Sequence, residues 1–343
     1  MIRKPILSII VPFFNAKNTL LKCLNSILQS CKGIPTEIIC VDDGSTDGGK
    51  EILKNVHPGK FCKIILLIHE KNRGLYQARL TALNYVRGKF IGFVDSDDYV
   101  DEPYFRELYK IMKQSRADVA VGRIVNVSQD GVKYRQTRCL DFPYEKSEME
   151  INGNTTTPPE QTKQTTEYDR YWTQAGACYP WHVLWNKLYR SELWTKRLDL
   201  LIKLNLHITM MEDFVYSSIV LSNAQIFRNG TAGAYYYVQS SNSSIANAAD
   251  CKKWEKNIMD MGTAFSQVEN ILNSESSLSQ YTDSCEKWKK RYSRYWYRNI
   301  QNSALTEEEK VKLKNLLKQA LQVDGLEMPS VSDEYFYEEA EFL

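Results

Sequence analysis

The stretch Phe90-Ile91-Gly92-Phe93-Val94-Asp95-Ser96-Asp97-Asp98 joins a continuous apolar run to three carboxylates within four residues. The apolar run predicts a buried strand of a parallel sheet that ends where the acids begin. Open α/β sheets bind ligands at this carboxyl edge. Acids that flank a small residue repel one another unless they share a divalent cation, or divide between a cation and a sugar hydroxyl. The alternative is a solvated turn in which Asp101 caps the next helix.

Strands and helices alternate around this stretch. Three other apolar, β-branched runs, at residues 8–11, 37–41 and 64–68, have the composition of buried strands. Apolar residues recur at helical spacing over residues 20–28 and 75–86. This βαβαβαβ order predicts an α/β fold, with a mostly parallel sheet flanked by helices and joined by right-handed crossovers.

The character of the sequence changes twice farther along. Residues 128–168 are polar and rich in Gln and Thr, which predicts a long loop or partly disordered insertion. Past residue 250, apolar and aromatic stripes at helical spacing predict two or three packed helices. The predicted regions are therefore 1–127, 128–245 and 246–343, the last a helical appendage.

The composition is that of a soluble globular protein, with 43% hydrophobic and 25% charged residues and a formal net charge of +2. This balance gives no argument for binding nucleic acid or an anionic membrane. Eight cysteines without a C-x-x-C pair predict reduced, structural thiols and a cytoplasmic protein. The apolar run at residues 6–14 contains Pro12 and is shorter than the ~20 residues of a membrane helix, so we expect a first strand there rather than a signal peptide.

The loop after the second strand is the strongest partner for the acidic stretch. Asp42-Asp43-Gly44-Ser45-Thr46-Asp47 can be a turn in which Thr46 or Asp47 caps a helix. It can also place Asp43 to accept a hydrogen bond from the imide N–H of a uracil-like base, because an ionised carboxylate only accepts. The sequence leaves both roles open.

Two other segments reach the same edge. Val11-Pro12-Phe13-Phe14-Asn15 ends the first strand, and Phe14 is either a core residue or a side chain that stacks on a base. Arg73 and Arg79 flank the start of a helix, where guanidinium groups suit phosphate recognition; the alternative is two solvated arginines. The absence of G-x-G-x-x-G and of G-x-x-x-x-G-K-[ST] argues against dinucleotide-binding and P-loop sites.

Glu212 and Asp213 lie between apolar residues just before a helical pattern. Asp213 can cap that helix or act as a general base facing the pocket, and the sequence alone favours the cap. The four histidines lack metal-ligand spacing and are expected to be ordinary surface or pocket residues. Trp181, Trp185 and residues 235–237 can line a sugar-binding surface or belong to the core.

Together these segments resemble the family 2 glycosyltransferases, the inverting, nucleotide-sugar-dependent enzymes of the GT-A fold. The matching motifs follow the family order between about residues 6 and 237. They are Ser8-Ile9-Ile10-Val11-Pro12-Phe13-Phe14-Asn15, Val41-Asp42-Asp43-Gly44-Ser45-Thr46-Asp47, Asn72-Arg73-Gly74-Leu75 with Ala78-Arg79, Gly92-Phe93-Val94-Asp95-Ser96-Asp97-Asp98, Trp185-Asn186-Lys187-Leu188-Tyr189 and Glu212-Asp213. Any one motif is weak, whereas the ordered set is highly specific.

The resemblance implies a role for each matching site residue. It implies that the nucleotide sugar is bound by Pro12, Phe14, Asn15, Asp43, Asn72, Arg79, Asp95 and Ser96, the last two near the ribose. It also implies that Asp97 holds a Mn²⁺ or Mg²⁺ ion on the diphosphate and that Asp213 is the catalytic base. The chain departs from the family at Leu80 and Ala82, where relatives usually carry Asn and Gly.

The prediction is an inverting transferase that moves a sugar from a nucleotide diphosphate sugar, by the Asp43 argument a UDP-sugar, to a hydroxyl of a glycan or lipid-linked acceptor, as in bacterial surface polysaccharide synthesis. Residues 1–127 are expected to bind the donor and 128–245 to form the acceptor side. A peripheral contact of the C-terminal helices with the inner face of the membrane, or with a partner protein, stays open. The alternative is a catalytically silent sugar-nucleotide-binding regulator or partner subunit, against which the intact Glu212-Asp213 pair argues.

Overall fold

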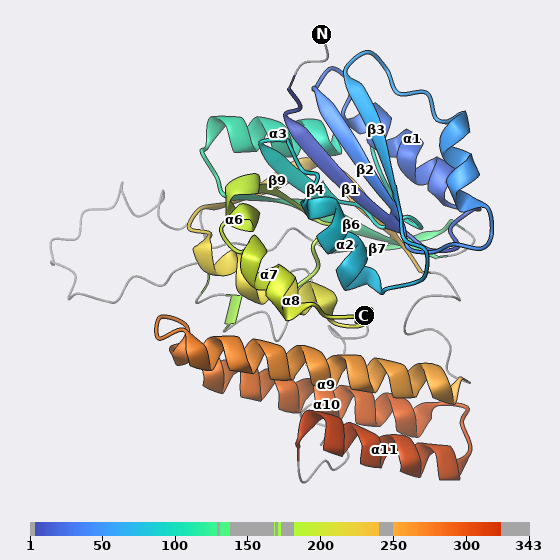
Figure 1. Cartoon of the computed structure of the whole chain (residues 1–343), viewed down its shortest axis with the longest axis vertical. Coiled ribbons are helices and arrows are strands. Elements are labelled where there is room, and N and C mark those ends of the chain that lie inside the picture. Colours follow the sequence, from blue (N-terminus) through green and yellow to red (C-terminus); the bar gives the residue numbers. More distant parts are fainter. Residues whose placement is uncertain are drawn as a thin grey trace, which may run out of the picture.

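The computed structural model describes residues 4–128, 131–137, 168, 171–172, 182–239 and 250–323. Within them, one sheet of nine strands forms the centre of an α/β domain, and a layer of long helices lies along one side of it (Figure 1). This arrangement confirms the predicted fold class.

The first four strands pair in parallel, as the sequence predicts. They are β1 (Leu7–Phe13), β2 (Thr36–Asp42), β3 (Cys62–Ile68) and β4 (Phe90–Phe93). Every residue of β1, β2 and β4 is buried, which explains their continuous apolar runs. The register places Phe13 beside Asp42 and Asp42 beside Ile68, so the loops after the first three strands leave from one edge of the sheet.

Three segments connect these strands. They are α1 (Leu20–Ser30), the 3-10 helix η1 (Gly49–Asn55) and α2 (Leu75–Leu83). Helix α1 has one buried apolar face, whereas seven of the nine residues of α2 are buried. The reason is that α2 lies between the sheet and two later helices, α7 (Leu198–Leu204) and α8 (Glu212–Val220).

The later strands extend the sheet in mixed directions. They are β5 (Tyr99–Val100), β6 (Val119–Val127), β7 (Lys133–Thr137), β8 (Lys187–Arg190) and β9 (Phe227–Val238). Strand β8 runs antiparallel to both β4 and β6, and β9 runs parallel to β6. The strand order is β3-β2-β1-β4-β8-β6-β9-β5, with β7 paired to β6.

Helix α3 (Tyr104–Gln114) follows the acidic stretch and packs against β6 and β9. The prediction that Asp101 caps this helix is wrong, because Pro103 occupies the cap position. The Asp101 carboxylate instead accepts the N–H of Ala234 in β9 at 2.9 Å. Pairing of β5 with β9 brings that strand next to Asp101 and gives its side chain a different partner.

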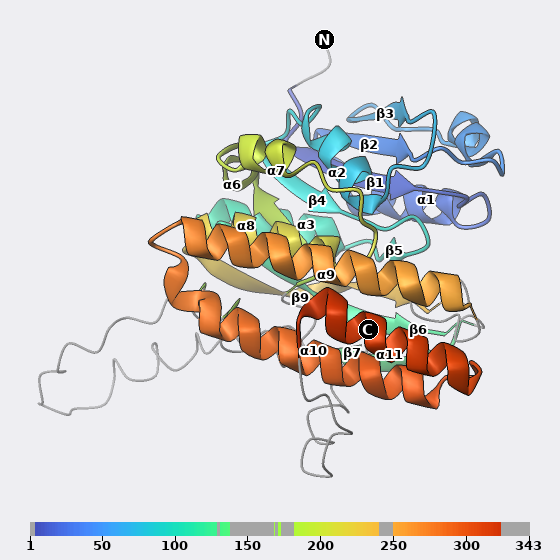
Figure 2. The same ribbon diagram turned by 60° about the horizontal axis from the view of Figure 1, so that its bottom comes forward.

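The predicted C-terminal helices are confirmed. They are α9 (Cys251–Ser274), the short η5 (Ser279–Tyr281), α10 (Thr282–Asn302) and α11 (Glu307–Leu321). Two shorter helices, α6 (Ser191–Thr195) and η4 (Leu221–Asn223), belong to the α/β domain. Figure 2 shows the three long helices side by side against the domain. Among the described residues, no helix is long and apolar enough to cross a membrane.

Most of the predicted polar insertion, residues 128–168, lies outside the described residues. In its described part, the Ser128 N–H donates to the Val132 carbonyl at 3.0 Å. Strand β7 follows and runs antiparallel to β6, so the start of this tract belongs to the sheet.

Candidate active site

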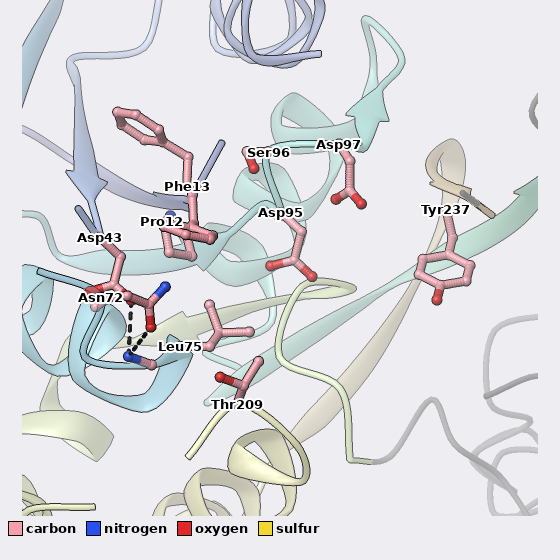
Figure 3. Close-up of a pocket in the computed structure, with 13 residues that line it drawn as sticks. Pro12, Phe13, Asp43, Asn72, Leu75, Asp95, Ser96, Asp97, Thr209 and Tyr237 are labelled. Atoms are coloured by element: carbon pink, nitrogen blue, oxygen red, sulfur yellow. Dashed lines mark hydrogen bonds between the residues drawn. The ribbon is translucent and has the colours of Figure 1, made fainter. Parts of the chain in front are cut away.

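A cavity of about 310 Å³ opens at the carboxyl edge of β1, β2 and β4 (Figure 3). Its lining consists of Pro12, Phe13, Phe14, Asp43, Asn72, Gly74, Leu75, Ala78, Asp95, Ser96, Asp97, Thr209 and Tyr237. Seven of the ten predicted site residues are therefore brought together here. The other three, Asn15, Arg79 and Asp213, do not line the cavity.

Asp43 occupies one end of the cavity and is only 4% exposed. Its Oδ1 accepts the N–H of Arg73 at 3.0 Å, and its Oδ2 accepts the N–H of Gly74 at 2.9 Å. Gly74 has a φ of +89°, and a Cβ at this position would lie 2.8 Å from the Ile208 carbonyl oxygen, so a side chain is excluded. The loop after β3 thus fixes the direction of the Asp43 carboxylate.

His69 is a site residue that the sequence argument missed. Its Nδ1 lies 2.6 Å from Asp43 Oδ1, and its Nε2 lies 2.9 Å from the Thr81 hydroxyl. The side chain is buried, so of the two expected positions, surface or pocket, the surface is excluded. A signal was present, because His69 immediately follows the strand at residues 62–68 and therefore leaves from the same edge as Asp43.

Asn15 joins two loops next to the cavity. Its N–H donates to Ser45 Oγ at 2.9 Å, and its Oδ1 accepts the N–H of Thr46 at 2.9 Å. Asp47 accepts the N–H of Gly49, the first residue of η1, at 2.8 Å, but Gly48 occupies the cap position, so the predicted cap at Thr46 or Asp47 is not found. The neighbouring Phe14 is 48% exposed and is therefore not a core residue.

The three acids after β4 have different surroundings. Asp95 and Asp97 face the cavity, with Tyr237 beyond them (Figure 3). Asp98 is buried instead, and its carboxylate accepts the Tyr235 hydroxyl and the Val238 N–H, each at 2.7 Å. Burial, with Asp95 adding to it, raises the pKa of Asp97 to about 6. Burial and the neighbouring Asp95 thus both disfavour the ionised form of Asp97 at the cavity edge.

The residues present fit a divalent cation shared with a ligand. Among the described residues, no group of three or more His, Cys, Asp or Glu side chains is arranged to hold a metal by itself. Asp97 and Asp95 offer carboxylate oxygens, which Mn²⁺ and Mg²⁺ accept, and a diphosphate would supply further oxygens. The raised pKa of Asp97 agrees with a site that a cation would stabilise.

Arg79 lies beneath the cavity and contacts three carboxylates. Its Nη2 is 2.8 Å from Asp95 Oδ1, and its Nη1 bonds to both Glu212 and Asp213. The guanidinium is 1% exposed, so neither of the expected positions, at a phosphate or in solvent, is found. The reason is the burial of α2 between the sheet and α8, which turns Arg79 inward.

Asp213 is the second residue of α8, and the cap position belongs to Met211, which has a φ of +67°. The prediction that Asp213 caps the helix is therefore wrong. Burial, followed by repulsion from Asp213, raises the pKa of Glu212 well above its usual range. Burial also raises the pKa of Asp213, although Arg79 opposes this shift. One guanidinium cannot neutralise three carboxylates, so burial favours the protonated form of both Glu212 and Asp213, and Arg79 opposes it.

The aromatic residues divide between the core and the cavity. Trp185 is buried and stacks on Tyr235 and Tyr237, at ring-centroid distances of 4.3 and 5.4 Å. Tyr235 is also buried, whereas Tyr237 lines the cavity. Trp181 lies outside the described residues. Thr209, on the loop before α8, is a lining residue that no sequence motif indicated.

Comparisons with known proteins agree with this geometry. The model of a family described as glycosyl transferase family 2 matches residues 8–208. Glycosyltransferase GlyA of Streptococcus pneumoniae is 34% identical over 57% of this chain and 26% of its own length. Glycosyltransferase EpsJ of Bacillus subtilis is 32% identical over 70% of this chain and 62% of its own length. A poly(ribitol-phosphate) beta-glucosyltransferase of Bacillus spizizenii is 33% identical over 37% of this chain and 20% of its own length.

The chain therefore spans between a fifth and about three fifths of the length of these relatives. Among solved structures, TarS of S. aureus has a TM-score of 0.54 at 18% identity, over 98% of this chain and 55% of that one. This similarity concerns the fold alone, and it supports the GT-A-type α/β architecture.

Proposed function

Because the chain belongs to glycosyl transferase family 2, we propose that it is an inverting glycosyltransferase that uses a UDP-sugar donor and a glycan or lipid-linked acceptor. One observation carries the proposal. The cavity extends from Asp43 to the carboxylates of Asp95 and Asp97, and Arg79 connects Asp95 to Asp213. The residues proposed for donor recognition, diphosphate binding and proton removal therefore belong to one connected site.

The Asp43 end supports recognition of uracil. Asp43 Oδ1 has two partners, whereas Oδ2 has one donor among the described residues, which leaves a lone pair for the imide N–H of the base. The exposed ring of Phe14 is available to stack on the same base. Pro12 and Asn72 form the remaining walls there. Asn15 acts indirectly, by holding the loop at Ser45 and Thr46.

The middle of the cavity supports binding of ribose and diphosphate. Asp95 and Ser96 are proposed to lie near the ribose, and Asp97 to hold the cation. A bound Mn²⁺ or Mg²⁺ ion would neutralise negative charge that the leaving diphosphate gains. Arg79 is not proposed to touch the phosphates. It keeps the Asp95 carboxylate in a fixed direction and balances part of the charge of α8.

The chemical step is assigned to Asp213. This carboxylate removes the proton of the acceptor hydroxyl while that oxygen attacks the anomeric carbon from the face opposite the nucleotide. Attack from that face inverts the configuration. Arg79 holds the Asp213 carboxylate by a hydrogen bond, and the raised pKa of Glu212 favours the neutral form of this neighbour.

The wider biological role is proposed from the relatives. Similarity to the poly(ribitol-phosphate) beta-glucosyltransferase of Bacillus spizizenii supports transfer to a surface polymer. We assign donor binding to residues 1–127 and the acceptor side to residues 128–245. A cytoplasmic location, peripheral at the inner face of the membrane, would suit a lipid-linked acceptor.

The test is a panel of nucleotide sugars measured by saturation-transfer NMR with and without Mn²⁺, followed by an assay of UDP release. We expect binding of UDP-hexoses or UDP-N-acetylhexosamines, and slow UDP release with water as the acceptor. Binding without any UDP release in the presence of bacterial glycan fractions would favour the silent regulator. Equal binding of every base would contradict the role of Asp43.

A further inference from the structure

The loop of residues 207–211 connects α7 to α8, and two elements hold it. The Ile208 carbonyl accepts the N–H of Tyr76 in α2 at 3.1 Å. From the C-terminal layer, Asp260 of α9 accepts the N–H groups of Thr209 and Met210 through its Oδ2, at 2.8 and 3.1 Å. This loop supplies Thr209 to the cavity and ends at the first residue of α8.

Within its own helix, Asp260 pairs with Lys256, four positions earlier. It lies in the middle of α9, far from the helix ends, and is 7% exposed. Burial of a carboxylate is unfavourable unless hydrogen bonds or a cation compensate for lost water. Its partners are the two loop N–H groups and Lys256, whose Nζ lies at 2.6 Å. Lys256 and the loop N–H groups compensate for the burial together, and the bonds to the loop are those that reach outside α9.

Helix α8 also packs against the C-terminal layer through its side chains. Phe214, next to Asp213, lies 4.9 Å from Phe265 of α9 and 5.6 Å from Trp288 of α10, measured between ring centroids. The segment that carries Asp213 thus touches the C-terminal helices at two points, the loop before the helix and its first turn.

We infer that Asp260 is a positioning residue of the active site, which holds residues 209–211 so that Thr209 faces the cavity and Asp213 stays beside Arg79. The inference rests on the proposed function of Asp213. It also means that the C-terminal helices belong to the catalytic unit and are not a separate appendage. Displacement of a catalytic group by about 1 Å can lower a rate by ~100-fold, so a small movement of this loop is sufficient.

The test compares Asp260 with a matched acid of the same helix. Asp250 also accepts a backbone N–H, that of Lys253 at 3.2 Å, but it does so at the exposed start of α9. We expect Asp260→Ala to lower kcat for UDP release by ~100-fold, with the Kd for UDP within about threefold. Asp260→Asn retains an acceptor oxygen and should recover part of the rate. Asp250→Ala and Asp250→Asn should stay near the parent.

A second measurement does not depend on activity. Hydrogen exchange of the amides of residues 209–213 in the full chain should be faster in Asp260→Ala than in Asp250→Ala. A folded Asp260→Ala protein with parental kcat would overturn the inference, whatever its exchange, and so would equal loss of rate in Asp250→Ala. If Asp260→Ala does not fold, Asp260→Asn against Asp250→Asn carries the same comparison. A parent that releases no UDP would count against the proposed function, and the exchange data would then decide separately whether Asp260 holds the loop.

Discussion

Arg79 Nη2 lies 2.8 Å from Asp95 Oδ1, and this contact joins the acidic turn after β4 to the helix that carries Asp213. The two residues are 16 positions apart, and the same guanidinium reaches Glu212 and Asp213 more than 130 positions away. The donor-binding and base-bearing parts of the site therefore share one cation.

Replacing Arg79 should destabilise the fold. Arg79→Met leaves buried carboxylates without their cation, so we expect the free energy of unfolding to fall by ~3–5 kcal/mol in urea denaturation. Arg73→Met is the control, because Arg73 is half-buried and its guanidinium makes one hydrogen bond, to Gln77. A similar small loss in both variants would show that the cluster contributes little to stability.

Asp213→Asn should fold and bind UDP but lose transfer. The amide cannot take a proton at neutral pH, and a general base typically contributes ~10²–10⁴-fold to kcat. Asp283→Asn is the matched control, because Asp283 is likewise the second residue of a helix, at the exposed start of α10. Near-parental kcat in a well-folded Asp213→Asn protein would refute the assignment and make Glu212 the next candidate.

Glu212→Gln should keep kcat within a few-fold of the parent. The raised pKa of Glu212 means that its protonated form is favoured, and an amide resembles that form in shape and charge. A large loss of activity in this variant, equal to that of Asp213→Asn, would show that Glu212 acts as an ionised carboxylate.

The same shift predicts how stability depends on pH. A carboxyl whose folded pKa exceeds its unfolded value binds more protons in the native state, so stability falls as pH rises from the unfolded pKa, ~4.3, towards the raised folded pKa. Over this pH window, the free energy of unfolding, measured by urea denaturation at each pH, should fall less steeply for Glu212→Gln than for the parent. Parallel curves would contradict the assigned direction.

Removal of the divalent cation should weaken donor binding. An ionised diphosphate beside Asp95 and Asp97 would otherwise meet repulsion, so calorimetry should show lower affinity for a UDP-sugar in excess EDTA than with Mn²⁺. In Asp97→Asn the gain from Mn²⁺ should largely disappear. Equal affinity under both conditions in the parent would rule out the proposed cation site.

Phe14→Ala should weaken UDP binding if the ring stacks on the base. Stacking of a base on an aromatic side chain is worth ~1–3 kcal/mol, which corresponds to roughly a 5- to 150-fold rise in Kd. Tyr85→Ala is the control, because Tyr85 is 47% exposed, nearly the same as Phe14 at 48%, and does not line the cavity. An unchanged Kd in Phe14→Ala would place the base elsewhere.

The strand ends were predictable from the sequence because they follow from local patterns. Parallel strands with continuous apolar runs bring Asp43 and Asp95 to one edge, and the structure confirms this. The direction of Arg79 was not predictable, since it depends on a helix more than 130 residues later covering α2. The errors at Asp101 and Asp213 have a related cause: an acid near a helix start has a tertiary partner, and that partner is invisible in local sequence.

The Tyr235 hydroxyl holds the acidic turn after β4 at both of its ends. It accepts the Asp95 N–H at 3.0 Å and donates to Asp98 at 2.7 Å, so both sides of Ser96 and Asp97 are tied to β9. A turn held at two points has already lost most of its conformational freedom before any ligand arrives. Preorganisation of this kind lowers the entropy cost of binding, so an incoming cation and diphosphate need not order the turn themselves.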